Sequence, residues 1–195
     1  AAGAAKPGAL EVVNTLSWTR TELVVLDREQ STAGDLVVDD RGTPVPSQRL
    51  SNGELVFLAK DVPPLAVRRF TVSAGKPHIE TRATADGATL DSGVVRLRVD
   101  EQTGGITELS MPGIDGNFAD TSGGESLNDY RYFIGDNPAK AQRNGPVKIS
   151  VGERGPLIAS LIIESAAPGC EQLRRELRVV AGGDGDAGGR GARDA

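Results

Sequence analysis

The sequence predicts an all-β protein, in which a small β-sandwich is followed by the first part of a larger one. Apolar and charged side chains alternate across residues 95–100, the period-two pattern of a strand with one buried face. Short apolar runs are separated by turn signals along most of the chain, which is typical of a sandwich. Gly (25) and Pro (11) are frequent in the 195 residues, and no segment requires a helix.

The first 75 residues contain short runs of strand composition. Pro46 cannot donate to a sheet ladder, so the segment at residues 45–48 is expected at a sheet edge. Trp18 lies between the first two runs and, as the single tryptophan, is expected to fill the core. We therefore expect strands at residues 10–13, 21–26, 35–40, 54–59 and 68–72.

A Gly75-Lys76-Pro77 break precedes the second group of strands. Residues 91–109 are predicted to form a hairpin in which Gly104 and Gly105 supply the positive-φ turn residues. Further strands are expected at residues 79–83, 89–90, 147–151, 157–164 and 173–180, with 157–164 central because it is continuously apolar. The expected organisation is a linker at 1–9, a small β-sandwich at 10–74, a partial large β-sandwich at 75–181 and a Gly-rich tail at 182–195.

Charge and hydropathy exclude several classes of partner. With 27 acidic and 22 basic residues the net charge is −5, and no basic cluster contains aromatics, so nucleic acid is not expected to bind. Glu171 and Glu176 bracket Arg174 and Arg175, which predicts a solvated strand face. No apolar run is long enough to span a membrane. The absence of a signal-peptide pattern and of any possible internal disulfide favours a cytoplasmic location.

The chain offers no catalytic or metal-binding constellation of its own. His78 and Cys170 are the only residues of their types, which excludes an internal disulfide and a Cys/His zinc site. We expect His78 at the surface or half-buried, and Cys170 in a turn or at a strand end. Oxygens of Asp115, Asp120 and Glu125 could hold calcium, but their spacing favours a solvated loop at 112–125. No catalytic residue, metal or cofactor is therefore expected in this chain.

Several motifs occur in an ordered succession. They are NTLSWTR at 14–20, VPSQ at 45–48, VPPL at 62–65, the hairpin at 93–109, LNDYRY at 127–132, GPL at 155–157 and ES at 164–165. Together they resemble the β domains of family 38 glycoside hydrolases, the α-mannosidases, over most of residues 10–180. Thr15 and Ser92 stand where the family usually has Pro and Asn, changes that affect turns. The resemblance implies that the second sandwich is galactose-mutarotase-like.

The resemblance also implies a non-catalytic part of a larger enzyme. Family members carry an N-terminal domain in which His and Asp residues bind zinc, and two Asp residues act as nucleophile and acid/base with retention of configuration. None of those residues has a counterpart here. The implied partners are this N-terminal catalytic domain of the same enzyme and an α-mannoside substrate, with zinc as the cofactor of the missing domain. Alone, the chain is expected to be inactive.

Tyr130 is the one site residue that the resemblance implies. It matches a family tyrosine that reaches the catalytic pocket and lines the sugar subsite, where a hydroxyl and a ring face can both contact a pyranose. In the alternative interpretation, Tyr130 and Tyr132 pack across strands. Asp129 is adjacent and would point to the opposite face.

Two further interpretations stay open. A free-standing carbohydrate-binding module would need an exposed row of aromatics, for which one Trp and two Tyr are a thin supply. A purely structural sandwich would mediate protein contacts.

Overall fold

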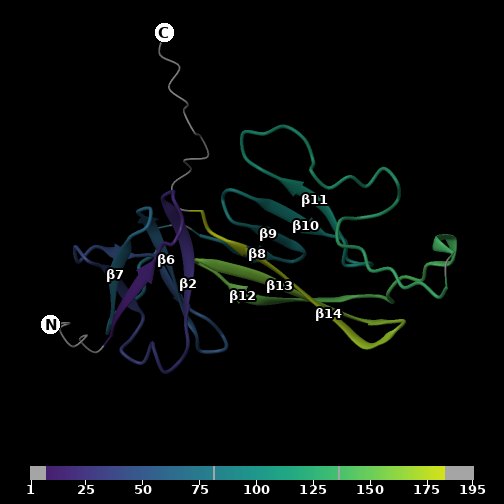
Figure 1. The fold of residues 1–195 in the computed structure, drawn as a ribbon. Helices are drawn as coiled ribbons and strands as arrows, with labels where there is room; N and C mark the ends of the chain where they lie inside the picture. The colour runs from purple at the N-terminus through teal and green to yellow at the C-terminus, as the bar shows by residue number, and fades with distance from the viewer. Residues whose placement is uncertain (1–7, 81, 136, 183–195) are drawn as a thin grey trace, which may run out of the picture.

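The computed structural model describes residues 8–80, 82–135 and 137–182, and it confirms the all-β prediction (Figure 1). The predicted linker and Gly-rich tail lie almost wholly outside these residues. Within the described ranges no helix is long and apolar enough to cross a membrane. The elements are β1 (Ala9–Val13), β2 (Arg20–Leu26), β3 (Leu36–Asp39), β4 (Pro44–Val45), β5 (Ser47–Arg49), β6 (Leu55–Val62), β7 (Val67–Ser73), β8 (Thr84–Asp86), β9 (Thr89–Asp91), β10 (Arg96–Val99), β11 (Ile106–Ser110), the 3-10 turn η1 (Pro138–Lys140), β12 (Lys148–Arg154), β13 (Ile158–Ala167) and β14 (Cys170–Val180).

Strands β1 to β7 form two sheets with a shared core. One sheet has the order β1-β7-β3-β4 and the other β2-β6-β5. Phe57 of β6 and Phe70 of β7 meet between the sheets, with ring centroids 5.0 Å apart and ring planes tilted by 52°. Both rings are buried. The strands predicted in the first 75 residues are confirmed, and the expected edge segment divides into β4 and β5.

Strands β8 to β14 form a second pair of sheets, ordered β11-β10-β9-β8 and β12-β13-β14. Leu97 and Val99 of β10 pack in one core with Leu161 and Ile163 of β13. The arginines that alternate with Leu97 and Val99 are exposed, as the period-two pattern predicts. Strand β13 is central in its sheet, which is also as predicted.

The turn between β10 and β11 is partly as predicted. Gly104 has a φ of 72°, whereas Gly105 is not in the positive-φ region. The carboxylate of Asp100 accepts the N–H groups of Gln102 at 2.9 Å and Thr103 at 2.7 Å. Hydrogen bonds to the Asp100 carboxylate therefore stabilise this turn, in place of the second positive-φ glycine that the sequence predicts.

Strand β6 joins the two cores. Leu55, Phe57 and Ala59 belong to the core of the first sandwich, whereas Val56 and Leu58 belong to the core of the second. Successive strand side chains point to opposite faces, so the sheet β2-β6-β5 is covered on both sides. This explains the unbroken apolar run at the start of β6, where the five residues Leu55 to Ala59 are all buried.

Gln48 of β5 fastens the first sandwich to the second. Its Oε1 accepts the backbone N–H groups of Leu157 at 2.8 Å and Ile158 at 2.7 Å, and its Nε2 donates to the Ile158 carbonyl at 3.2 Å. The Gln48 side chain is buried, as are both partner residues. A buried backbone group without a partner is costly. The Gln48 amide bonds to three buried backbone groups at the start of β13 and so avoids this cost.

The expectation that Trp18 fills the core is wrong, since it is 59% exposed. Asn14 is buried instead, and its Nδ2 donates to the Trp18 carbonyl at 2.7 Å and to the carbonyls of Val62 and Pro63 at 3.0 Å. Its Oδ1 accepts the Leu16 N–H at 3.0 Å. These bonds fix the loop between β1 and β2 and leave the Trp18 ring outside.

The strand predicted at residues 79–83 is also wrong, because the described part of this segment makes no ladder. Backbone groups in and next to this segment bond elsewhere: Ala83 N–H donates to the Pro156 carbonyl at 2.7 Å, and the carbonyl of the preceding His78 accepts the Ser47 N–H at 3.3 Å. Strand β8 begins only at Thr84. Contacts distant in sequence therefore override the local strand composition.

Candidate functional site

Tyr130 lies in the irregular segment that follows Leu127, and it is half-buried. Its hydroxyl donates to the carbonyl of Pro168 at 2.5 Å, in the tight turn between β13 and β14. Partial burial, and then the neighbouring Cys170 thiol, raise the pKa of Tyr130 above its ordinary value. The phenol is therefore protonated at neutral pH, and the hydroxyl oxygen can still accept a hydrogen bond.

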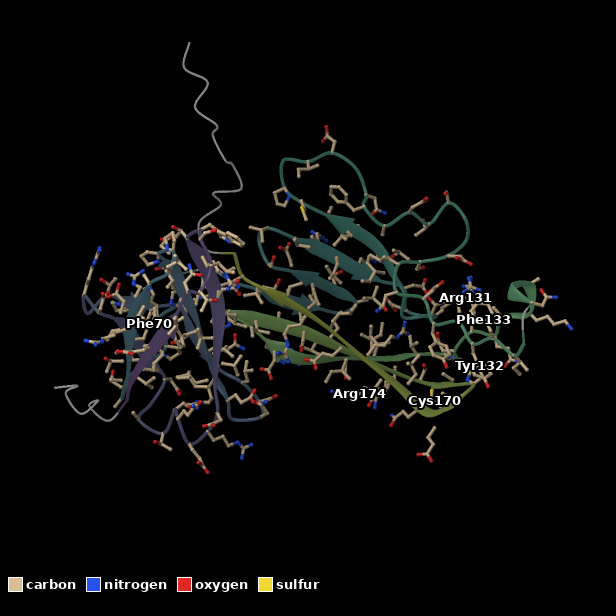
Figure 2. The ribbon with its side chains drawn as sticks, in the orientation of Figure 1. Phe70, Arg131, Tyr132, Phe133, Cys170 and Arg174 are labelled. Atoms are coloured by element: carbon tan, nitrogen blue, oxygen red, sulfur yellow. The ribbon has the colours of Figure 1, made fainter. Side chains whose placement is uncertain are left out.

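Tyr132 lies against the same turn. A Cβ placed on Gly169 would come within 2.3 Å of Tyr132 Cε2, so the ring occupies the space that a side chain at this position would need. Figure 2 shows Tyr132 and Cys170 at the far end of the β13–β14 hairpin. Both tyrosines thus contact the hairpin turn from one segment. Neither lies in a regular strand, although Tyr132 forms an isolated bridge with Gln142.

Asp129 has different partners from Tyr130. Its Oδ2 accepts the Ser126 N–H at 3.1 Å and lies 3.6 Å from Nη1 of Arg143. A Cβ added to Gly105 would lie 2.6 Å from Oδ1 of Asp129. This carboxylate therefore bonds to Ser126, pairs with Arg143 and lies close to Gly105 of the β10–β11 turn.

Arg175 corrects the prediction of a solvated Arg174-Arg175 pair. Arg174 is exposed, but Arg175 is half-buried and donates from Nη1 to the Asn128 carbonyl at 3.0 Å and from Nη2 to the Thr103 carbonyl at 2.8 Å. Burial lowers the pKa of Arg175, and the nearby Asp129 carboxylate partly opposes this shift. A Cβ at Gly104 would lie 2.3 Å from Nη2 of Arg175, so the glycine makes room for the guanidinium.

These contacts bring three segments distant in sequence to one end of the second sandwich. They are the β10–β11 turn, the segment around Tyr130 and the β13–β14 hairpin. The resemblance indicated Tyr130 alone. Strand alternation could have indicated Arg175, because it lies on the same face of β14 as Leu173 and Leu177.

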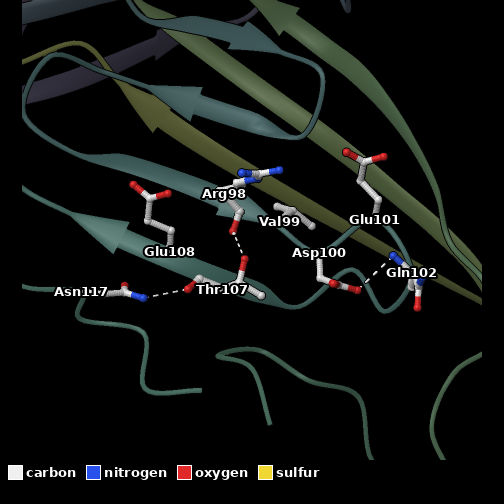
Figure 3. A pocket seen from close by; sticks show the side chains of 8 residues that line it. All are labelled: Arg98, Val99, Asp100, Glu101, Gln102, Thr107, Glu108 and Asn117. Atoms are coloured by element: carbon white, nitrogen blue, oxygen red, sulfur yellow. Dashed lines mark hydrogen bonds between the residues drawn. The ribbon is translucent and has the colours of Figure 1, made fainter. Parts of the chain in front are cut away.

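A polar hollow of about 590 Å³ lies along β10 and β11 (Figure 3). Several of its polar groups are already bonded: Asn117 Nδ2 donates to the Thr107 carbonyl at 2.8 Å, and Thr107 Oγ1 donates to the Arg98 carbonyl at 3.4 Å. The backbone N–H of Thr103 lowers the pKa of Asp100; burial opposes this, and the Thr103 hydroxyl and Gln102 N–H reinforce it. The residues that line the hollow are Arg98, Val99, Asp100, Glu101, Gln102, Thr107, Glu108 and Asn117.

The remaining predicted positions are surface features. His78 is half-buried, with Nε2 3.3 Å from Oε1 of Glu80, and Cys170 is exposed at the start of β14. Both positions agree with the sequence analysis. Asp115, Asp120 and Glu125 are exposed, and no group of three potential metal-ligating side chains gathers within the residues that the structure covers.

Comparison with known proteins identifies the fold class. Neither a scan against protein-family models nor a search of curated proteins finds a match. Solved structures do match, each over part of its own length. A glycosyl hydrolase family 38 protein from Enterococcus faecalis has a TM-score of 0.50 and 15% identity, over 80% of this chain and 24% of its own. An alpha-mannosidase from Enterococcus faecalis V583 has a TM-score of 0.51 and 15% identity, over 80% of this chain and 23% of its own.

The predicted resemblance is therefore confirmed for the fold. Most of this chain has the same architecture as a portion of family 38 glycoside hydrolase structures. The chain spans about a quarter of the length of these structures, at 24% and 23%.

Proposed function

We propose that this chain is a non-catalytic β-sandwich portion of a family 38 α-mannosidase-like enzyme. It would brace the N-terminal catalytic domain of the same enzyme and line the mannoside pocket. One observation carries the proposal: 80% of the chain matches family 38 structures, yet it accounts for only 24% and 23% of their length. The residues that perform the chemistry would then lie on the remaining polypeptide.

The side chains of this chain fit zinc poorly, which supports placing the catalytic residues on the remaining polypeptide. His78 is the single histidine, and within the described residues no cluster of ligating side chains surrounds it. The zinc that such enzymes use would therefore be held by the catalytic domain. This chain would supply shape and support, and alone it would not hydrolyse an α-mannoside.

A bracing role is supported by the way in which the two sandwiches are joined. The sheet β2-β6-β5 contributes to both cores, and Gln48 bonds directly to β13. Ser51 adds a second link through its backbone N–H, which donates to Oε1 of Glu153 at 3.0 Å. A unit of this kind resists relative movement of its parts, which suits a support for a catalytic domain.

Tyr130 is the residue that we propose for the pocket wall. In the intact enzyme, Tyr130→Phe is expected to lower kcat for an α-mannoside by roughly tenfold or more, because a hydroxyl oxygen that accepts a hydrogen bond from the sugar is lost. Loss of the bond to Pro168 should also cost about 1 kcal/mol of stability. Steady-state kinetics and thermal unfolding measure the two effects separately.

Tyr132→Phe is the matched control, because Tyr132 also lies against the hairpin turn. Its kcat should stay within about twofold of the wild-type value. If Tyr130→Phe destabilises the enzyme and leaves kcat unchanged, the packing interpretation of Tyr130 is correct and its pocket role is excluded.

A second candidate function is favoured by the exposure of Trp18. Trp18 is 59% exposed and its backbone carbonyl is held by Asn14, so its ring is available for stacking on a sugar, as a carbohydrate-binding module requires. Under this interpretation, manno-oligosaccharides bind the isolated chain in calorimetric titration, and Trp18→Ala lowers the affinity at least tenfold. Phe118→Ala, at a ring that is 49% exposed, is the control. Absence of binding by the wild-type chain removes this candidate.

A further inference from the structure

Arg175 is a half-buried arginine on the same face of β14 as Leu173 and Leu177. Its Nε atom is buried and has no hydrogen-bond partner among the residues that the structure covers. Both Nη atoms donate to backbone carbonyls. Burying part of a cation costs free energy, whereas an apolar side chain would pack here without that cost. Packing alone therefore does not explain an arginine at this position.

The two carbonyls that Arg175 contacts belong to segments distant in sequence. Nη2 donates to the Thr103 carbonyl of the β10–β11 turn at 2.8 Å, and Nη1 donates to the Asn128 carbonyl at 3.0 Å. The Thr103 carbonyl also accepts Nδ2 of Asn144 at 3.1 Å, so both of its lone pairs are used. The planar guanidinium holds its two acceptors at a fixed spacing. Arg175 therefore fixes the position of Asn128 relative to this turn.

Asn128 has a backbone conformation that depends on its surroundings. Its φ of 66° lies in the left-handed region that residues other than glycine rarely adopt. The Asn128 side chain is exposed, so its packing does not stabilise this conformation. Ser126 and Asp129 are joined by two hydrogen bonds around it, at 3.1 and 3.3 Å, and Arg175 bonds to its carbonyl. Such a conformation persists where surrounding contacts determine it.

Tyr130 follows Asn128 by two residues and is held by the same hairpin. Its hydroxyl donates to the Pro168 carbonyl at 2.5 Å. Pro168 lies in the turn between β13 and β14, and Arg175 lies in β14. The hairpin thus contacts the backbone just before Tyr130 through Arg175 and the end of the Tyr130 side chain through Pro168. The ring lies between these two contacts, so its orientation depends on both.

We propose that Arg175 is a positioning residue for Tyr130: it bridges the β10–β11 turn and Asn128, and so sets the direction in which the Tyr130 ring points. The positioning is a property of this chain alone. Its effect on the turnover of an α-mannoside rests on the proposed function, because Arg175 acts on the sugar only through Tyr130.

NMR of the tyrosine rings tests the positioning directly, because the 195-residue chain contains two tyrosines. With isotope-labelled rings, Tyr132→Phe assigns the two sets of signals. Arg175→Met keeps a long side chain and removes both donors. It should move the Tyr130 signals most of the way toward their values in the denatured chain, and the Tyr132 signals less, because Tyr132 is held by its bridge to Gln142. Unmoved Tyr130 signals in a folded Arg175→Met chain would overturn the proposal.

Arg174→Met is the matched control, because Arg174 is exposed on the opposite face of β14. It should leave both sets of ring signals unchanged. Arg175→Lys keeps the charge but has a single nitrogen, so it should still move the Tyr130 signals. If circular dichroism shows that Arg175→Met unfolds the chain, Arg175→Lys supplies the same comparison. Equal shifts in Arg174→Met and Arg175→Met would contradict the proposal.

A double-mutant cycle in the intact enzyme tests the effect on turnover. Arg175→Met should lower kcat for an α-mannoside about as much as Tyr130→Phe, by roughly tenfold. In the Tyr130→Phe background it should lower kcat by less than about twofold, because the group that Arg175 positions is already lost. A residue that only stabilises the fold would lower activity by the same factor in both backgrounds, and that result would count against positioning.

The two experiments separate this inference from the proposed function. Suppose that Tyr130→Phe leaves kcat unchanged while Arg175→Met moves the Tyr130 ring signals. Tyr130 is then not a wall of the pocket, and its positioning by Arg175 still holds. If instead Tyr130→Phe lowers kcat, and Arg175→Met changes neither kcat nor the ring signals, the pocket role holds and the positioning by Arg175 is wrong.

Discussion

Replacing Gln48 by alanine is expected to lower the free energy of unfolding by about 3 kcal/mol. The substitution leaves the N–H groups of Leu157 and Ile158 without their present acceptor, in a region where both residues are buried. The Ile158 carbonyl also loses the Gln48 amide donor. Each unsatisfied buried group carries a desolvation penalty, so the loss exceeds that of an ordinary hydrogen bond. Denaturant unfolding followed by circular dichroism measures the change.

Two controls separate hydrogen bonding from packing. Gln48→Met keeps the length of the side chain but removes the amide, and it should destabilise the chain nearly as much as Gln48→Ala. Gln102→Ala, at an exposed position of the β10–β11 turn, should change stability by less than about 0.5 kcal/mol. A near-neutral Gln48→Met variant would show that packing, and not the amide bonds, fastens the two sandwiches.

Phe57→Ala is expected to cost about 4 kcal/mol, the other large effect. The Phe57 ring is fully buried and packs against Phe70 with centroids 5.0 Å apart, so truncation removes apolar contacts and leaves a cavity. Since β6 joins both cores, both sandwiches should unfold at lower denaturant in a single transition. Fluorescence of Trp18 and the circular dichroism signal should report the same midpoint.

Phe118→Ala is the control for this experiment. Phe118 is 49% exposed in the loop after β11, so its truncation should change stability by less than about 0.5 kcal/mol. A Phe57→Ala variant as stable as Phe118→Ala would mean that the two sheets of the first sandwich do not pack as described.

The strands could be predicted from the sequence where their stabilisation is local. Alternation in β10 fixed which side chains of the hairpin are buried, and Leu97 and Val99 are indeed buried. The continuous apolar run placed β13 at the centre of its sheet. These patterns follow directly from the two faces of a strand.

The errors arose where distant contacts decide the structure. Trp18 is exposed because Asn14 bonds to the carbonyls of Val62 and Pro63, which are far away in sequence. No strand forms in the described residues of the 79–83 segment, where the Ala83 N–H bonds to Pro156. Local propensity contains no information on such partners.

The candidate site was only partly predictable for the same reason. Tyr130 came from the family resemblance, but nothing in the sequence indicated that its hydroxyl bonds to Pro168. Arg175 was grouped with Arg174 as a solvated residue, although strand alternation places the two side chains on opposite faces of β14. Applying the alternation to every charged residue would have separated them.

The most direct test of the proposed function compares α-mannoside hydrolysis by three proteins in the presence of zinc. They are the 195-residue chain, the intact gene product, and that product with this segment deleted. We expect the intact product to be active, the isolated chain to be inactive, and the deletion to remove activity because the pocket loses its support and one wall. Robust hydrolysis by the isolated chain, or full activity after the deletion, would contradict the account.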